Sequence, residues 1–210
     1  MYIGLISDTH GVFSQQFREF LEPVDQIWHA GDFGGGMQLA EEIAAFKPLV
    51  GVAGNCDNYD LRYIHPLHRF FECGGMKVLM THVGGYPGRY DAKARELIDR
   101  YRPDIFVCGH SHILKVVRDT KRDMLVINPG AAGIQGFHVV RTALRFRMDE
   151  GRIYDMFDYE AVKTEKQSGD EFTYKMAREF AVKGKLQKIA TDLCREITEA
   201  ITGTQVSYAD

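Results

Sequence analysis

Seven side chains of types that commonly bind metals stand in short polar loops, each directly after an apolar run. They comprise two carboxylates, one amide and four imidazoles, namely Asp8, His10, Asp32, Asn55, His82, His110 and His112. This set offers nitrogen and oxygen ligands without a thiolate, which suits hard-to-borderline divalent metals. Seven side chains exceed the needs of one tetrahedral ion and suit two ions that share a bridging carboxylate. The residue types therefore predict a two-metal centre, a device that promotes in-line phosphoryl displacement.

The apolar runs that precede these loops predict the buried strands that must position them. The expected strands cover residues 2–6, 26–29, 49–52, 76–81 and 105–108. Ligands bind at the carboxyl ends of strands in open α/β sheets, so the seven side chains are expected to meet at one edge.

The remaining patterns predict an α/β fold built from two packed sheets. Helices expected at residues 14–21, 37–46 and 91–101 alternate with the strands, with Asp91 as the cap of the last. Gly74-Gly75 predicts a tight hairpin between strands 69–73 and 76–81. Further strands at 115–118, 124–128, 142–148 and 153–159 follow with short turns. Hairpins beside strand–helix units indicate two mixed sheets flanked by helices.

The composition of the chain changes from about residue 161. Residues 163–170 are polar and linker-like, and helical periodicity follows at 171–182 and 185–202. We therefore predict a catalytic domain at residues 1–160. A helical extension at 161–210 is expected to pack on that domain or to form the interface of a homo-oligomer.

Overall composition indicates a cytoplasmic globular protein. The 210 residues are 45% hydrophobic with a formal net charge of -3, which does not favour an extended nucleic-acid surface. No apolar run approaches the roughly 20 residues of a membrane span. The N-terminus has no basic region before its short apolar stretch, and the four cysteines form no paired motif, so a secreted disulfide framework is not expected.

The polar loops together resemble those of the calcineurin-like metallophosphoesterases, in the small bacterial and archaeal phosphodiesterase branch. Five motifs carry the resemblance in the family's order: Asp8-x-His10, Gly31-Asp32, Gly54-Asn55-Cys56-Asp57, Thr81-His82 and Gly109-His110-Ser111-His112. The resemblance covers roughly residues 1–160 and implies a four-layer α-β-β-α sandwich.

The resemblance also implies roles for the seven side chains. Asp8, His10 and His112 would hold the first metal, and Asn55, His82 and His110 the second. Asp32 would bridge the two ions, and the Asn55 amide would also help to orient a phosphate oxygen. The implied reaction is hydrolysis of a phosphodiester by a hydroxide that bridges the metals. Mn²⁺ is the favoured ion, and Fe, Zn²⁺, Ni²⁺ or Mg²⁺ would also fit the site.

Cys56 departs from the family pattern, because many relatives carry a histidine there that protonates the leaving group. A thiol is a poor acid for an alkoxide. We therefore hypothesise that the substrate has a leaving group that needs little help, or that another group supplies the proton. The candidate donors in this sequence are His65, His68 and Asp57.

Several further residues have competing interpretations. Arg89 and Tyr90, in the loop after His82, either grip the phosphate and base of a substrate or are simply exposed. His138 either lines the site or stands in a turn, and we favour the turn. His29 is expected to be structural.

We predict a metal-dependent phosphodiesterase acting on small phosphodiesters or nucleotides. One alternative is a phosphomonoesterase or a nucleotide pyrophosphatase. Another is a non-catalytic scaffold, since the retromer scaffold subunit has the same fold with an altered metal site. The presence of all seven ligating side chains favours the enzyme.

Overall fold

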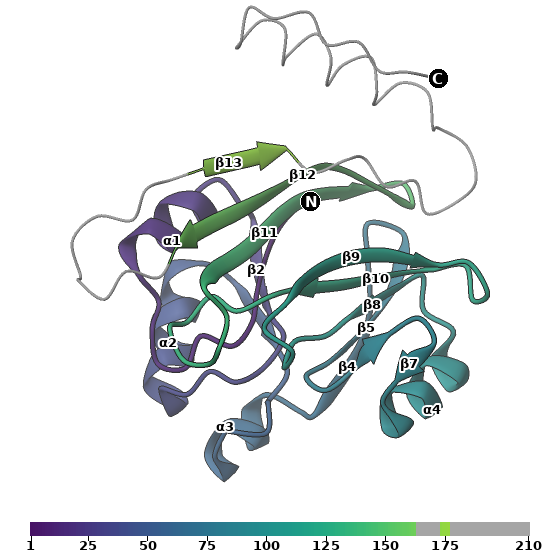
Figure 1. Ribbon diagram of the computed structural model, residues 1–210, viewed down its shortest axis with the longest axis horizontal. Coiled ribbons are helices and arrows are strands. Elements are labelled where there is room, and N and C mark those ends of the chain that lie inside the picture. The colour runs from purple at the N-terminus through teal and green to yellow at the C-terminus, as the bar shows by residue number, and fades with distance from the viewer. Residues whose placement is uncertain (163–172, 177–210) are drawn as a thin grey trace, which may run out of the picture.

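The structure, a computed structural model, describes residues 1–162 and 173–176, and its centre is a pair of stacked mixed sheets (Figure 1). The first sheet has six strands in the order β13-β12-β11-β1-β2-β3. Its strands are β1 (Tyr2–Ile6), β2 (Gln26–His29), β3 (Leu49–Gly51), β11 (Val140–Asp149), β12 (Arg152–Val162) and β13 (Thr173–Met176). β1, β2 and β3 run parallel, whereas β11 joins β1 in antiparallel fashion.

The second sheet has five strands in the order β4-β5-β8-β10-β9. They are β4 (His68–Cys73), β5 (Met76–Thr81), β8 (Ile105–Val107), β9 (Leu114–Asp119) and β10 (Met124–Pro129). The three central strands are parallel, and the two edge strands are antiparallel to their neighbours. A separate small hairpin joins β6 (Gly85–Tyr86) to β7 (Arg89–Tyr90).

The main core lies between the two sheets because alternate residues of each strand point to opposite faces. Ile3 and Leu5 of β1 pack in one cluster with Val78 of β5 and Ile105 of β8. Tyr2 and Ile6, which precede and follow this pair along β1, belong to a different cluster, on the outer face of the first sheet. Fully burying one such aliphatic side chain contributes about 1.5–3 kcal/mol, so this period-two pattern fixes the register of the strands.

Helices cover the outer face of each sheet and complete four layers (Figure 1). The outer face of the first sheet packs against α1 (Gln15–Leu21), α2 (Gly36–Phe46) and α3 (Tyr59–Ile64). The outer face of the second sheet packs against α4 (Ala92–Tyr101) through Ala94, Leu97 and Ile98. The α/β fold with two mixed sheets flanked by helices is therefore confirmed.

Local sequence signals explain where several elements begin and turn. Asp91 caps α4, since its Oδ1 accepts hydrogen bonds from the backbone N–H groups of Lys93 and Ala94. Gly74 and Gly75 connect β4 to β5 with φ angles of 55° and 77°. Both angles lie in the left-handed region that a two-residue hairpin turn requires and that glycine adopts without strain.

The structure differs from the sequence prediction in two segments. Residues 59–64 form the short helix α3, which lies outside all the helices and strands expected from the sequence. Thr173–Met176 form β13 inside the predicted helix 171–182, so that prediction is wrong at these residues. β13 pairs with the edge of β12, where a strand satisfies backbone groups that a helix would leave without partners.

The rest of the predicted extension, including the helix at 185–202, lies outside the described residues. In the described part of the chain, no helix is both long and apolar enough to cross a membrane.

Candidate metal centre

The seven predicted ligands lie in loops that follow five strands. Three of these strands belong to the first sheet and two to the second. The first sheet presents its loops after β1, β2 and β3, and the second sheet after β5 and β8. The first sheet thus contributes Asp8, His10, Asp32 and Asn55, and the second contributes His82, His110 and His112. A site built from them stands where the carboxyl ends of parallel strands from both sheets come together.

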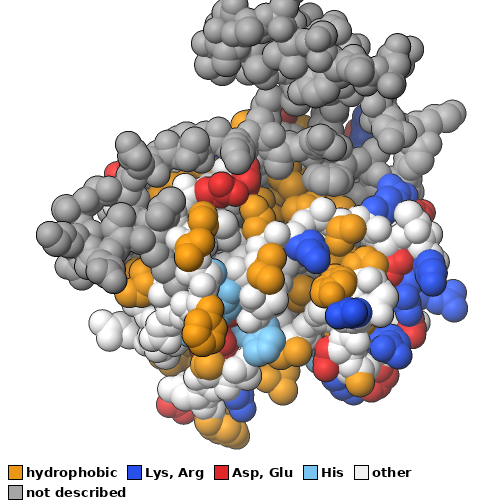
Figure 2. Space-filling view, viewed as in Figure 1, with side chains coloured by type: hydrophobic (Ala, Val, Ile, Leu, Met, Phe, Trp, Pro, Cys, Tyr) orange, Lys and Arg blue, Asp and Glu red, His pale blue; other side chains and the backbone are white. Residues whose placement is uncertain are grey.

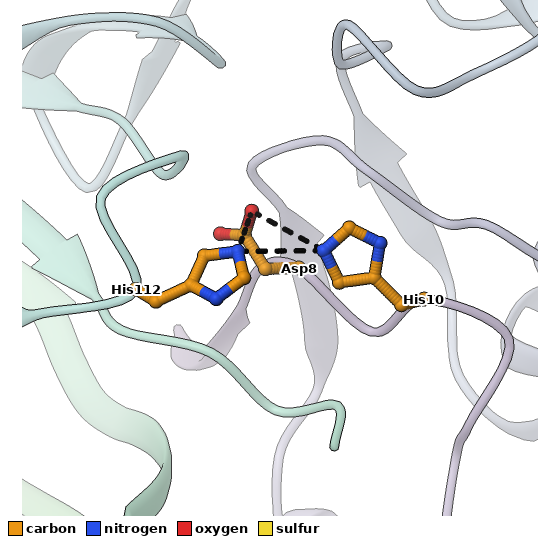
Figure 3. Close-up of side chains that lie close together, drawn as sticks. All are labelled: Asp8, His10 and His112. Atoms are coloured by element: carbon orange, nitrogen blue, oxygen red, sulfur yellow. Dashed lines mark hydrogen bonds and ion pairs between the residues drawn. The ribbon is translucent and has the colours of Figure 1, made fainter. Parts of the chain in front are cut away.

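Asp8, His10 and His112 form a first cluster, in which one ligand atom of each lies within 4.8 Å of the other two (Figure 3). His112 Nε2 is 3.1 Å from Asp8 Oδ1 and 3.4 Å from His10 Nε2. Asp8 follows β1, whereas His112 follows β8, so the cluster joins the two sheets. One carboxylate and two imidazoles are a suitable ligand set for a divalent ion.

Asp32, His82 and His110 form a second cluster with the same spacing of ligand atoms. His82 Nε2 lies 3.2 Å from Asp32 Oδ2 and 3.9 Å from Asp8 Oδ1, so the second cluster adjoins the first. Asp32 also groups with His10, a member of the first cluster, and with Cys56. Asp32 therefore lies between the clusters, where a carboxylate that bridges two ions must be.

Two buried atoms at the junction of the clusters have charged groups close by but no hydrogen bond of good geometry. Asp8 Oδ1 and His82 Nε2 make no well-directed hydrogen bond, although both side chains are almost fully buried. Leaving such groups unsatisfied in a protein interior costs about 1–3 kcal/mol each, and more when they are charged. A divalent cation would satisfy both atoms, so the residues fit the metals that the resemblance implies.

The electrostatics of the second cluster agree with a site that holds cations. Burial opposes ionisation of Asp32, but the neighbouring His82 and the Cys56 backbone N–H outweigh it and hold the pKa of Asp32 well below its usual range. Burial would lower the pKa of His82, but Asp32 and Asp8 raise it above its ordinary value. Asp32 is thus ionised at neutral pH, as metal ligation requires.

Backbone groups orient the ligand side chains. His82 Nδ1 lies 2.8 Å from the Ala30 carbonyl oxygen, so a proton on Nδ1 leaves Nε2 available toward the cluster. The His110 backbone N–H donates to Asp8 Oδ2, and the Cys56 backbone N–H donates to Asp32 Oδ1. The carboxylates of Asp8 and Asp32 are therefore each held in place by a backbone hydrogen bond to one oxygen.

His138 contacts Nδ1 of His112, the ring nitrogen that does not face Asp8 and His10. His112 Nδ1 lies 3.0 Å from His138 Nδ1, and His138 Nε2 lies 3.1 Å from the Gly133 carbonyl oxygen. If His112 offers Nε2 to a metal, its Nδ1 carries the proton and donates to His138. His138 then donates its own Nε2 proton to Gly133, so one consistent set of tautomers runs through the chain of contacts. The site interpretation of His138, which we ranked second to a turn, is the one that the geometry favours.

Replacing His138 with alanine is expected to weaken divalent-metal binding about 10–100-fold, because His112 loses the contact that orients its ring. Titration calorimetry with Mn²⁺ or Zn²⁺ measures this change. His68→Ala serves as the matched control, since His68 packs near Tyr101 instead of near the cluster. Equal metal affinity in His138→Ala and the parent protein would contradict the supporting role.

Five of the seven predicted ligands have left-handed backbone conformations. Their φ angles lie between 45° and 67°, at Asp8, His10, Asp32, His110 and His112. Residues other than glycine rarely adopt this region, and such strain concentrates at functional sites where the surrounding structure enforces it. The loops hold these side chains toward the cluster at a cost in backbone energy.

Asn55 stands apart from the other six predicted ligands in its described contacts. Its side chain is exposed, and its amide donates to Cys56 Sγ at 3.3 Å. The loop that carries it is held by Arg62, which donates to the Asn55 carbonyl oxygen. Ligation by Asn55 stays a prediction.

The structure places Arg89 and Tyr90 differently, although they are neighbours in β7. Arg89 is exposed and lines a cavity that also reaches His110. Tyr90 is buried, its hydroxyl donates to Asp119 Oδ2, and burial together with Asp119 raises its pKa. The structure does not bring the Tyr90 side chain to the ligand cluster, so its predicted contact with substrate has no geometric support.

None of the three candidate proton donors is brought to the ligand cluster by its described contacts. The Asp57 carboxylate accepts backbone hydrogen bonds from Gly34 and Gly54, which is a structural role. His65 is buried and stacks on Phe33, with ring centroids 5.0 Å apart. His68 opens β4 and packs near Tyr101.

His29 is structural, as predicted. Its Nδ1 accepts from the Gly31 backbone N–H, and its Nε2 lies 2.9 Å from Thr9 Oγ1. Burial holds the pKa of His29 well below its ordinary value, so the ring stays neutral.

The described part of the fold resembles solved structures at low sequence identity. Vps29 from Chaetomium thermophilum is 16% identical with a TM-score of 0.68, and the match covers 84% of this chain and 97% of that chain. Vps29 from Entamoeba histolytica, complexed with Zn²⁺, is 17% identical with a TM-score of 0.61, covering 84% and 99% of the two chains.

A predicted phosphoesterase from Streptococcus pneumoniae is 20% identical, with a TM-score of 0.55 and coverage of 83% and 97%. Comparison with curated proteins gave no match. At these identities the likenesses show the shared fold alone. The family model for the calcineurin-like phosphoesterase superfamily domain matches residues 1–151, which contain all seven predicted ligands. By this match, the chain belongs to the calcineurin-like phosphoesterase superfamily.

Proposed function

We propose that this protein is a dinuclear metal-dependent phosphodiesterase of the small bacterial and archaeal branch. The observation that carries the proposal is the position of Asp32, whose ligand atoms group both with His10 and with the pair His82 and His110. A carboxylate shared in this way suits two ions held about 3.5–4 Å apart, the arrangement that clamps an in-line displacement at phosphorus.

The side chains of the two clusters have different roles in the proposed reaction. When bound, a pair of divalent ions supplies an activated water and positive charge for the phosphoryl oxygens. Asp8, His10 and His112 hold one position, and His82 and His110 the other, with Asn55 proposed as a further ligand. Asp32 stays ionised because His82 and the Cys56 N–H stabilise its charge. We propose Mn²⁺ as the native ion, since imidazole and carboxylate ligands together suit it.

The third-motif cysteine favours substrates with good leaving groups. Cys56 is exposed, and its backbone N–H donates to Asp32 Oδ1. A thiol is a weak acid and protonates an alkoxide poorly. This chemistry supports diesters whose leaving alcohol is acidic over unactivated alkyl esters.

Replacing Cys56 with histidine is expected to raise turnover of alkyl phosphodiesters by about tenfold or more, because a positioned imidazole can act as general acid. Turnover of bis-p-nitrophenyl phosphate should change little, since nitrophenolate needs no proton to leave. Steady-state rates on both substrates give the comparison, and Cys56→Ser controls for loss of the thiol alone. No gain on alkyl esters would argue against this account of the motif.

A non-catalytic scaffold is the second candidate function. Three apolar side chains, Ile134, Phe137 and Val139, are exposed on the segment that also carries His138, and Phe137 is fully exposed. Exposed apolar groups of this kind mark binding surfaces for other proteins. The same fold occurs in Vps29.

Hydrolysis assays with added metals discriminate between the two functions. The protein is stripped of metal and assayed on bis-p-nitrophenyl phosphate and p-nitrophenyl phosphate after addition of Mn²⁺, Zn²⁺, Ni²⁺ or Mg²⁺. Metal-dependent turnover that prefers the diester supports the phosphodiesterase. A preference for the monoester would favour a phosphomonoesterase instead. If the protein binds two ions but hydrolyses neither substrate with any of the metals, the scaffold function is favoured over the enzyme.

The sequence also supports proposals for the localisation, the substrate and the oligomeric state of the protein. We propose a cytoplasmic protein that acts on a small phosphodiester or nucleotide, with a homo-oligomer as a further proposal. Gel filtration with light scattering tests the oligomer.

A further inference from the structure

We propose that the cavity beside His110 binds a nucleotide, meaning a flat ring that carries its own phosphate, as the part of the substrate that keeps the phosphate after hydrolysis. The inference rests on the proposed phosphodiesterase and names its substrate class. The cavity has a volume of about 280 Å³ and runs from His110 to the β6–β7 hairpin. Because His110 belongs to the second ligand cluster, a group in this cavity lies directly beside the predicted metal centre.

Apolar side chains form part of the wall of the cavity. Val83, Tyr86 and Ile113 all line it, and they are 40%, 37% and 61% exposed. Water-exposed apolar side chains gathered around one hollow beside an active centre favour a ligand with an apolar face. The phenol ring of Tyr86, which carries Lys115 Nζ over one face, adds a flat apolar group to this wall.

Two cationic side chains give the same cavity a preference for anions. Lys115 lines it with its Nζ 4.0 Å from the Tyr86 ring centroid, and Arg89 lines it from β7. The one carboxylate in the lining belongs to Asp91, whose Oδ1 is engaged by the backbone N–H groups that it caps in α4. A ligand that satisfies both the ring surface and the cations must combine a flat apolar part with an anionic group.

Lysine and arginine side chains are the natural partners of phosphate, through charge-assisted hydrogen bonds. Figure 2 shows the exposed histidines of this face bordered by hydrophobic side chains, with Lys and Arg side chains nearby. A nucleotide matches the cavity because it carries the heteroaromatic ring and the phosphate on one compact frame.

The hairpin that carries Tyr86 and Arg89 is anchored before any ligand arrives. Tyr90 is buried next to Arg89 and donates its hydroxyl proton to Asp119 Oδ2 at 2.8 Å. Gly84 lies so close to the residue that follows β8 that a Cβ there would be 2.4 Å from Cys108 Cβ. A hairpin that is fixed in this way loses little conformational entropy when a ligand binds in the cavity. Tyr90 therefore contributes to the cavity by keeping the β6–β7 hairpin in place.

The size of the cavity sets a limit on the ligand. Pockets that enclose drug-sized ligands span about 300–1,000 Å³, so this cavity is suited to one ring system with its substituents. In the reaction, water adds its hydroxyl to the phosphorus of the nucleotide, and the bond from that phosphorus to the oxygen of the second, acidic alcohol breaks. The other proton of water ends on that alcohol, so the products are a nucleoside monophosphate and the free alcohol.

Binding of adenosine 5′-monophosphate (AMP) to the 210-residue chain as purified tests the proposal by titration calorimetry. AMP is expected to bind at least about tenfold more tightly than adenosine, which lacks the phosphate, and than ribose 5-phosphate, which lacks the ring. Lys115→Met and Tyr86→Ala are each expected to weaken AMP binding about tenfold. Lys77→Met is the matched control, since Lys77 is exposed at the start of β5, away from His82.

AMP binding that is no tighter than adenosine binding, or that Lys115→Met leaves at the Lys77→Met value, would overturn the proposal. The binding measurement needs no turnover, so it separates this inference from the proposed function. If AMP does not bind but the diester is hydrolysed, only the nucleotide proposal is rejected and the phosphodiesterase stands. If AMP binds at this cavity but no metal supports hydrolysis, the proposed phosphodiesterase is rejected, and the assignment of a nucleotide substrate is rejected with it.

Discussion

Asp32→Asn is expected to lower hydrolysis of bis-p-nitrophenyl phosphate at least about a thousandfold, equivalent to roughly 4 kcal/mol of transition-state stabilisation. The effect is large because Asp32 groups with ligands of both clusters, so one substitution weakens both metal positions. The buried carboxylate is also held ionised by its neighbours, and a neutral amide cannot replace its charge.

Measured metal content and steady-state rates together check this result. Asp99→Asn is a suitable control, because it removes the same charge from an exposed residue that pairs only with Arg122 among the described contacts. Thermal unfolding of both variants separates misfolding from loss of the centre. An Asp32→Asn variant that is folded, binds two ions and hydrolyses the diester at the parent rate would rule out the bridging role.

Gly109→Ala is expected to lower the free energy of unfolding by about 3 kcal/mol and to weaken metal binding as well. A Cβ at this position would lie 2.0 Å from Ser7 Oγ, 2.9 Å from Asp8 Oδ2 and 3.0 Å from the Ala30 carbonyl oxygen. The loop before His110 would have to move away from β1. That movement separates His110 from Asp8, whose Oδ2 accepts the His110 backbone N–H.

Urea unfolding and metal calorimetry measure the two effects. Gly88→Ala is the control, because Gly88 has a φ angle of +86° but no heavy atom within 4 Å of the added Cβ. Its backbone strain alone should cost about 1–2 kcal/mol. Equal stability in the two variants would show that the loop before His110 relaxes freely and that the close approach carries no function.

Much of the fold was predictable because its strands bury their side chains in regular patterns. β1, β2 and β5 match their predicted ranges, since each is a short run of buried residues ended by a polar loop. β13 was not predictable from its own residues. Its segment has helical periodicity, and only the long-range pairing with β12 makes it a strand.

The candidate site was predictable to a similar extent. Loops after consecutive strands converge at one edge in a parallel sheet, so all seven ligands were expected to meet there. Six of them do so, in two clusters. The turn interpretation of His138 was favoured because His138 directly follows Gly136-Phe137. Its contact with His112 depends on how residues 133–139 fold back. The wall formed by Tyr86 and Lys115 joins a hairpin to a distant strand, which no local pattern reveals.

The left-handed ligand residues have an evolutionary consequence. Each of the five carries about 1–2 kcal/mol of backbone strain, and their sum is comparable to the 5–15 kcal/mol by which a domain is stable. Glycine at any of these positions would relieve the strain and remove a ligand in one step. A descendant released from its chemistry would therefore gain stability by exchanging these residues, and decay of the centre would begin in the loops while both sheets stayed intact.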